Sequence, residues 1–211
     1  MLRIVEQQAS ASLRQRMEKA GCAFDFLVLV PEASDAADEV LHRQAVDLLF
    51  QHLKAQWLER HRQLTLDPRY TEAAPPTMDW DLSKAVAKPL NRDERARLMR
   101  IDQDDQHTYA LYAAFCDPPY GTRFSDDTPQ ALFSEWLDLL GLEDGTDGVV
   151  LSWVDNFNFN LNWTASDEYD PARTPWSDYF DDGLEWWGVW CLSIWNPKRR
   201  TLAVLAASTT D

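Results

Sequence analysis

The segment WSDYFDDGLEWWG at 176–188 combines three tryptophans with four carboxylates. Paired carboxylates beside aromatic rings are typical of sugar-processing sites, where one carboxyl donates a proton, the other stabilises positive charge and a ring stacks on the sugar. The separation of the carboxyl groups, on which this mechanism depends, does not follow from sequence. The candidate binding residues are Trp176, Asp178, Tyr179, Asp181, Asp182, Glu185 and Trp186.

The spacing of these carboxylates does not match the calcium loop D-x-[DN]-x-[DN]-G-x5-E. With Gly183 at the sixth position, Asp178 and Asp182 fall on ligand positions. However, Phe180 and Val189 stand where the third and twelfth ligands are needed. An irregular calcium site that uses Asp181 and Glu185 as well stays open as an alternative, but we expect neither a metal nor a cofactor.

Other catalytic signatures are missing. The sequence has no G-x-x-x-x-G-K-[ST], G-x-G-x-x-G or G-x-S-x-G, which excludes the common nucleotide-binding and serine-hydrolase loops. His42, His52 and His61 share a predicted helix at spacings that rotate them apart, and His107 stands alone. We therefore expect solvated histidines. Cys116 has only His107 as a nearby base and no sign of a lowered thiol pKa, so we predict no catalytic residue.

Compartment follows from the cysteines and the apolar runs. The three cysteines, Cys22, Cys116 and Cys191, lie far apart in the sequence, and their odd number and spacing match neither a disulfide framework nor a zinc site. We expect the thiols of Cys22 and Cys191 to be buried and unreactive. The first 21 residues lack the apolar core of a signal peptide, and the longest apolar run, FLVLV at 26–30, is too short to span a bilayer. We expect a cytoplasmic protein.

The net charge of −15 arises in the middle of the chain. Residues 1–100 carry 15 acidic and 15 basic side chains, whereas residues 101–182 carry 18 acidic side chains and only two basic ones. Nucleic acids and anionic membranes attract positive charge, so direct binding to either is disfavoured. A basic protein partner would be attracted instead, and ordinary acidic solubility is the alternative interpretation.

Apolar residues at three- and four-residue steps predict a series of helices. These cover residues 3–20, about 36–62, about 91–101, the further candidate 105–115, and 129–140. Ser34 or Asp35 is the expected cap of the second helix and Asn91 that of the helix near 91. Thr128 is expected to cap the last helix, which ends at Gly141.

Strands are predicted at residues 22–31, 148–154, 156–163 and on both sides of NPKRR at 196–200, where the last two form an antiparallel hairpin. Helices thus come first and strands last. This order predicts an α+β fold with N-terminal helices packed on a mainly antiparallel C-terminal sheet. We expect a single domain, 1–211, with its helical part at about 1–141 and its sheet part at about 142–211.

The strand that begins near Trp186 is apolar on both faces, so we expect it to be central and covered on both sides. The preceding Asp-Asp-Gly is typical of a turn, and its two carboxylates carry too much charge to be buried without partners, so we expect this turn to be exposed. Trp176 and Tyr179 can either cover the core or face a ligand. The asparagine face of residues 156–162 is either a solvated strand face or a set of hydrogen-bonding groups for a sugar or another chain.

The C-terminal segments WSDYFDDGLEWWG and WCLSIWNPKRRTLAVLAAS, with the final TTD, resemble a family of uncharacterised bacterial proteins. The shared signature is W-S-x-Y-F-D-x-G-x-E-W-W-G, and the upstream AAFCDPPYG is a further candidate for the same pattern. The resemblance covers about 45 residues. It implies a bacterial cytoplasmic origin and carries over no activity.

The leading hypothesis is a non-enzymatic acidic binding protein that engages a basic protein partner, as an immunity-type toxin inhibitor would. The alternative is a carbohydrate-binding or carbohydrate-active protein that uses the loop at 176–187. A third hypothesis is an acidic mimic of DNA. Oligomeric state does not follow from the sequence.

Overall fold

The computed structural model describes residues 2–5, 8–32, 38–101, 111–124, 127–142, 147–154, 176–184 and 187–209. The helices within these ranges are α1 (Gln8–Ala20), α2 (Glu39–Leu64), α3 (Arg92–Leu98), α4 (Leu111–Cys116) and α5 (Pro129–Leu140). The strands are β1 (Leu2–Ile4), β2 (Asp25–Pro31), β3 (Lys88–Pro89), β4 (Val149–Ser152), β5 (Val189–Asn196) and β6 (Thr201–Ser208). Single 3-10 turns lie at Leu82–Lys84, Asp178–Phe180 and Asp182–Leu184.

The strands form one antiparallel sheet in the order β1-β2-β6-β5-β4-β3. Its centre is the hairpin of β5 and β6, which pair from Val189 with Ser208 to Asn196 with Thr201. The buried Asn196 shapes the turn because its side-chain oxygen accepts the amides of Lys198 and Arg199, both at 3.0 Å. The predicted hairpin and its Asn-Pro turn are confirmed.

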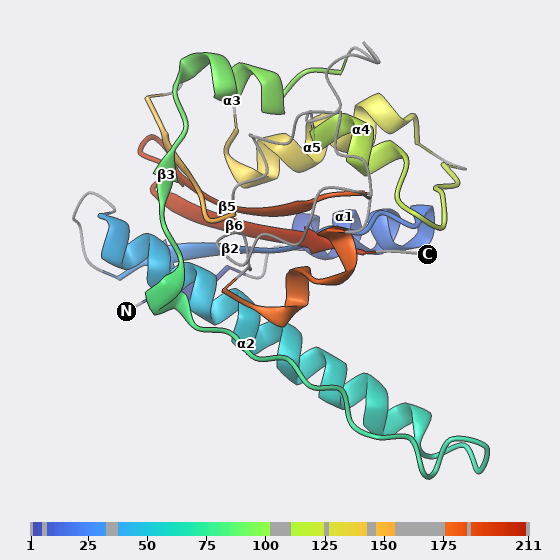
Figure 1. The fold of residues 1–211 in the computed structure, drawn as a ribbon. Coiled ribbons are helices and arrows are strands. Elements are labelled where there is room, and N and C mark those ends of the chain that lie inside the picture. Colours follow the sequence, from blue (N-terminus) through green and yellow to red (C-terminus); the bar gives the residue numbers. More distant parts are fainter. Residues whose placement is uncertain are drawn as a thin grey trace, which may run out of the picture.

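Helices cover both faces of this sheet (Figure 1). One face carries Trp190, Leu192 and Ile194 of β5 and packs against α1, α3, α4 and α5. The other carries Val189, Cys191 and Trp195 and packs against α2 and the 3-10 turn that begins at Asp178. The fold is therefore α+β in a single domain, as predicted, and β5 is the expected central strand with two buried faces.

The clearest end signals in the sequence correspond to real helix ends. Thr128 caps α5 by accepting the amide of Ala131 at 3.2 Å, and Gly141 ends it in a left-handed conformation with φ of 78°. Asn91 caps α3 in a capping box with Glu94. These predictions are confirmed.

Two predicted boundaries at the N-terminal side are wrong. The helix predicted from residue 3 begins at Gln8, because Leu2–Ile4 pair with Leu29–Pro31 as the edge strand β1. The long helix is capped by Asp38, whose carboxylate accepts the amide of Leu41 at 2.9 Å, rather than by Ser34 or Asp35. Apolar periodicity locates the body of a helix well, but a strand of three residues is too short to show a periodicity of its own, so the pattern assigns it to the neighbouring helix.

The long helix α2 extends beyond the sheet, and the chain then turns back beside it (Figure 1). Hydrogen bonds tie the returning segment to the helix: His61 Nε2 lies 2.9 Å from the carbonyl of Ala73, Lys54 donates to the carbonyl of Met78 at 3.0 Å, and the Trp80 indole donates to Asp47 at 2.8 Å. None of the helices in the described part of the chain is both long and apolar enough to cross a membrane.

Candidate functional site

The acidic turn, residues 176–182, is clamped to the segment 79–81 that returns from α2. Ser177 forms a β-bridge with Trp80, and the amide of Asp81 donates to the carbonyl of Trp176 at 2.8 Å. The Asp178 carboxylate accepts the amide of Asp79 at 2.8 Å, and the Ser177 hydroxyl donates to the carbonyl of Asp79 at 2.9 Å. Two segments about a hundred residues apart in sequence therefore hold each other in place.

The two candidate binding rings of this turn, those of Trp176 and Tyr179, point into the core. Trp176 is 7 % exposed, packs 4.8 Å from Phe50 between ring centroids, and donates its indole N–H to the carbonyl of Trp153 at 2.6 Å. Tyr179 is also 7 % exposed, and its hydroxyl donates to Asp25 at 3.2 Å. Burial raises the pKa of Tyr179 well above its ordinary value and also raises the pKa of Asp25. Of the two interpretations that the sequence left open, the first holds: these rings cover the core and present no stacking surface to a ligand.

The carboxylates of the turn face outward. Asp178, Asp181 and Asp182 are exposed. The pKa of Asp181 is raised, first by partial burial and then by repulsion from Asp178 and Asp182. A cation that approaches this turn would relieve that repulsion. The predicted site residues Glu185 and Trp186 lie outside the described residues, as does the asparagine face of residues 156–162.

Gly183, directly after the acidic turn, packs closely against Gly188 and Ser208, and its replacement tests that packing. A Cβ atom at this position would lie 2.3 Å from the carbonyl oxygen of Gly188 and 2.7 Å from Ser208 Oγ, so the backbone would have to move. We expect Gly183→Ala to lower the free energy of unfolding by about 3 kcal/mol in urea titrations. Gly121→Ala is the control, because no atom lies within 4 Å there and only its positive φ opposes the change, at about 1 kcal/mol. Equal effects at the two positions would contradict the steric explanation.

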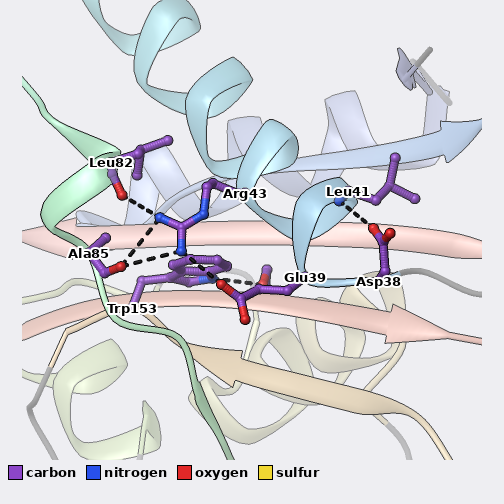
Figure 2. A network of polar contacts seen from close by, with 8 residues as sticks. Asp38, Glu39, Leu41, Arg43, Leu82, Ala85 and Trp153 are labelled. Carbon is purple, nitrogen blue, oxygen red and sulfur yellow. Dashed lines mark hydrogen bonds and ion pairs between the residues drawn. The ribbon is translucent and has the colours of Figure 1, made fainter.

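A second polar cluster lies at the beginning of α2. Arg43 donates to the carbonyls of Leu82 and Ala85 and pairs with Glu39 at 2.8 Å, and its guanidinium lies 5.0 Å from the ring of Trp153 (Figure 2). Figure 2 shows that Arg43 thereby joins the helix, the segment before β3 and the end of β4. Its N–H groups donate to backbone carbonyls and its charge is paired with Glu39, so this arginine has a structural role: it holds these three elements together.

Beneath that arginine, a histidine and a serine meet in the core. His42 Nδ1 lies 2.7 Å from Ser193 Oγ, and the Trp153 indole donates to the same oxygen at 2.7 Å. Both His42 and Ser193 are fully buried. Ser193 thus accepts one hydrogen bond from Trp153 and shares the other with His42. His42 Nε2 has no hydrogen-bond partner among the described residues. The expectation of a solvated histidine is therefore wrong for His42.

Burial decides what this histidine–serine contact can do chemically. It lowers the pKa of His42 to about 4, although Asp38 and Glu39 act in the opposite direction. A neutral imidazole next to a hydroxyl has the residue types of a nucleophile and its base. However, a substrate has no access to a fully buried serine in the middle of the central strand. We interpret the cluster as a polar contact of the core and not as a catalytic centre.

The thiols give no support to nucleophilic chemistry either. Burial raises the pKa of Cys22 to about 12 and raises those of Cys116 and Cys191. Cys191 is buried as predicted, whereas Cys22 is only half-buried. Within the described ranges, no group of three or more His, Cys, Asp or Glu side chains lies suitably for a metal ion.

Comparison with known proteins identifies no relative: no family model, no curated protein and no solved structure matches the chain. Its function must therefore be argued from its own residues, of which the exposed carboxylates of the acidic turn are the strongest candidates.

Proposed function

We propose that this protein is a non-enzymatic binding protein whose acidic turn engages a basic protein partner. The observation that carries the proposal is the exposure of Asp178, Asp181 and Asp182 on a turn fixed by its backbone and Ser177 to segment 79–81. Carboxylates on a held turn lose little freedom when a partner binds, so more of their electrostatic attraction appears as affinity. An acidic protein with exposed, fixed carboxylates fits the class of immunity-type inhibitors of basic toxins.

The charge distribution supports the same partner chemistry. The chain carries a net charge of −15, and residues 101–182 supply the excess of acidic groups. A field of this sign accelerates the encounter with a basic protein and repels nucleic acid and anionic lipid. A cytoplasmic location in a bacterial cell is part of the proposal. Carbohydrate binding, the alternative, gains no support from the turn, because the Trp176 and Tyr179 rings are packed inward.

Charge reversal at the turn tests the proposal. The partner is first captured from a lysate of the source cells at low salt, identified and purified. For Asp181→Lys with Asp182→Lys, we expect the dissociation constant for that partner to rise at least ten-fold, or about 1.4 kcal/mol. We also expect salt to have less effect on the remaining binding.

The matched control reverses two exposed carboxylates elsewhere, Glu18→Lys with Asp147→Lys, which changes the net charge equally. This control should keep most of the affinity. If both variants weakened binding equally, net charge alone would account for it and the acidic turn would not be the site. If neither did, the partner would bind another surface.

A further inference from the structure

The C-terminal part of α2 and the chain that returns beside it form an arm, residues 54–76, that projects from the body of the protein (Figure 1). The base of this arm rests on the core, where the Trp57 ring stacks on Tyr179 with centroids 6.0 Å apart. Beyond that contact, and within the described part of the chain, the helix has the returning segment along one side (Figure 1), and Glu59, Arg60, Arg62, Gln63 and Leu64 are exposed. The end of the arm therefore contributes little to the core and presents its other sides to solvent.

The tip of the arm exposes three large apolar side chains within seven residues. Leu66 is 75 % exposed, Leu64 46 % and Tyr70 43 %. The side chains of Arg62 and Arg69 flank them and are themselves about three-quarters exposed. Tyrosine and arginine next to aliphatic side chains are the residue types that protein interfaces favour.

Charge differs in sign between the tip of the arm and its base. The tip, residues 62–70, has two basic side chains and one acidic one, in a chain whose net charge is −15. Lys54 lies at the base, where its Nζ is 3.9 Å from Asp79. The two segments that form the base, residues 77–83 and 176–182, contain five aspartates and no basic residue. All five, Asp79, Asp81, Asp178, Asp181 and Asp182, are exposed.

We propose that the arm binds a second copy of this chain, with the tip of each arm against the acidic base of the other. A two-fold axis between antiparallel arms places each tip next to the oppositely charged base of its partner, so the same contact forms twice. The attraction then acts at both ends, and the apolar tip residues leave water. A narrow arm buries little area, so the dimer is a weak one.

Local ion pairs at the tip do not prevent this contact. Arg62 pairs with Glu59 at 3.2 Å and Arg69 with Asp67 at 2.6 Å. Such exposed pairs contribute at most about 1 kcal/mol, and an arginine has further donors for a second carboxylate.

The dimer does not depend on the proposed binding of a basic protein, although both use the acidic turn. A basic partner would compete with the arm of the second copy. Partner binding should therefore dissociate the dimer, and loss of the arm contact alone should leave partner binding intact.

Sedimentation velocity of the full chain measures dimerisation, and swapping the charges of the arm tip and the acidic turn tests the proposed contact. At low salt and up to roughly 200 µM, we expect the average mass to rise from the monomer value of 24.3 kDa towards twice that value. Arg62→Glu with Arg69→Glu should weaken dimerisation at least ten-fold, and so should Asp181→Lys with Asp182→Lys. The protein with all four changes should regain it. Leu66→Ser should weaken it without any change of charge.

The control is Lys198→Glu with Arg200→Glu, which makes the same change in charge at the exposed turn between β5 and β6 and should leave the dimer unchanged. A wild-type chain that stays monomeric over this range overturns the proposal. So does a dimer that survives the arm variants or is not recovered in the four-fold variant. Loss of partner binding in Asp181→Lys with Asp182→Lys, but not in the arm variant, would support the proposed function separately.

Discussion

Trp176→Ala should lower the free energy of unfolding by about 3–5 kcal/mol, the usual cost of truncating a buried tryptophan. The Trp176 ring packs between Phe50 and Phe180, with centroids at 4.8 and 5.1 Å. Its removal leaves a cavity under the acidic turn and also leaves the carbonyl of Trp153 without the indole donor at 2.6 Å. Urea unfolding followed by circular dichroism measures the loss.

Two further variants separate this role from a role in ligand binding. Trp176→Phe keeps most of the apolar volume and loses the indole donor, so it should cost about 1–2 kcal/mol. Asp182→Asn changes an exposed side chain of the same turn and should stay within about 0.5 kcal/mol. If Trp176→Ala also stayed within that limit, the ring would be dispensable to the core, and the ligand-facing interpretation would return.

The strongest local signals of the sequence predicted most of the architecture. The Thr128 cap with Gly141 defines α5, and the apolar runs around the Asn-Pro turn define the β5–β6 hairpin. Each signal acts over a few residues, where backbone chemistry alone decides the outcome. The edge strand β1 has no such signal, because its three residues gain their structure only from pairing with β2.

The candidate site was less predictable, because burial depends on partners distant in sequence. The carboxylates of Asp181 and Asp182 were expected to be exposed, and they are. Tryptophan and tyrosine occur both in binding sites and in cores, so the residue types of Trp176 and Tyr179 do not distinguish the two. Contacts with residues distant in sequence, such as Phe50 and the segment at 79–81, place them inside.

The burial of His42 was partly visible in the sequence. It precedes Ala45, Val46 and Leu49 by three, four and seven residues, which is the spacing of the buried face of α2. A serine among apolar residues in β5 was a second sign, since a buried hydroxyl needs a partner. What the sequence did not indicate is that these two residues meet across 151 positions.

Acid should destabilise the protein through this histidine. The pKa of His42 is about 4 in the folded protein, against an ordinary value of 6.5. At pH 7 both the folded and the unfolded chain hold it neutral, so it carries no penalty. As the pH falls from about 6.5 towards 4, the unfolded chain binds a proton that the folded chain does not, and stability is lost. Below about pH 4 both states are protonated and the loss levels off, at roughly 3 kcal/mol in total.

His42→Leu isolates this contribution from the carboxylates that titrate in the same range. Leucine fills much of the imidazole volume, and Ser193 stays available to accept the Trp153 indole N–H. We expect the variant to lose roughly 2–3 kcal/mol less than the wild type between pH 7 and pH 4.5, as measured by urea unfolding at both values. His52→Leu, at a less buried position of the same helix, is the control for the histidine-to-leucine change itself.

NMR titration of the histidine ring protons provides the direct readout. The His42 signal should stay in its neutral position at pH 5, while a solvated histidine is already charged there. A His42 signal that titrates near 6.5, together with equal pH dependence of wild type and His42→Leu, would mean that protonation is tolerated in the folded chain. The core would then have to open around Ser193 to admit water, because an imidazolium donates from both nitrogens, and only one of them has a partner among the described residues.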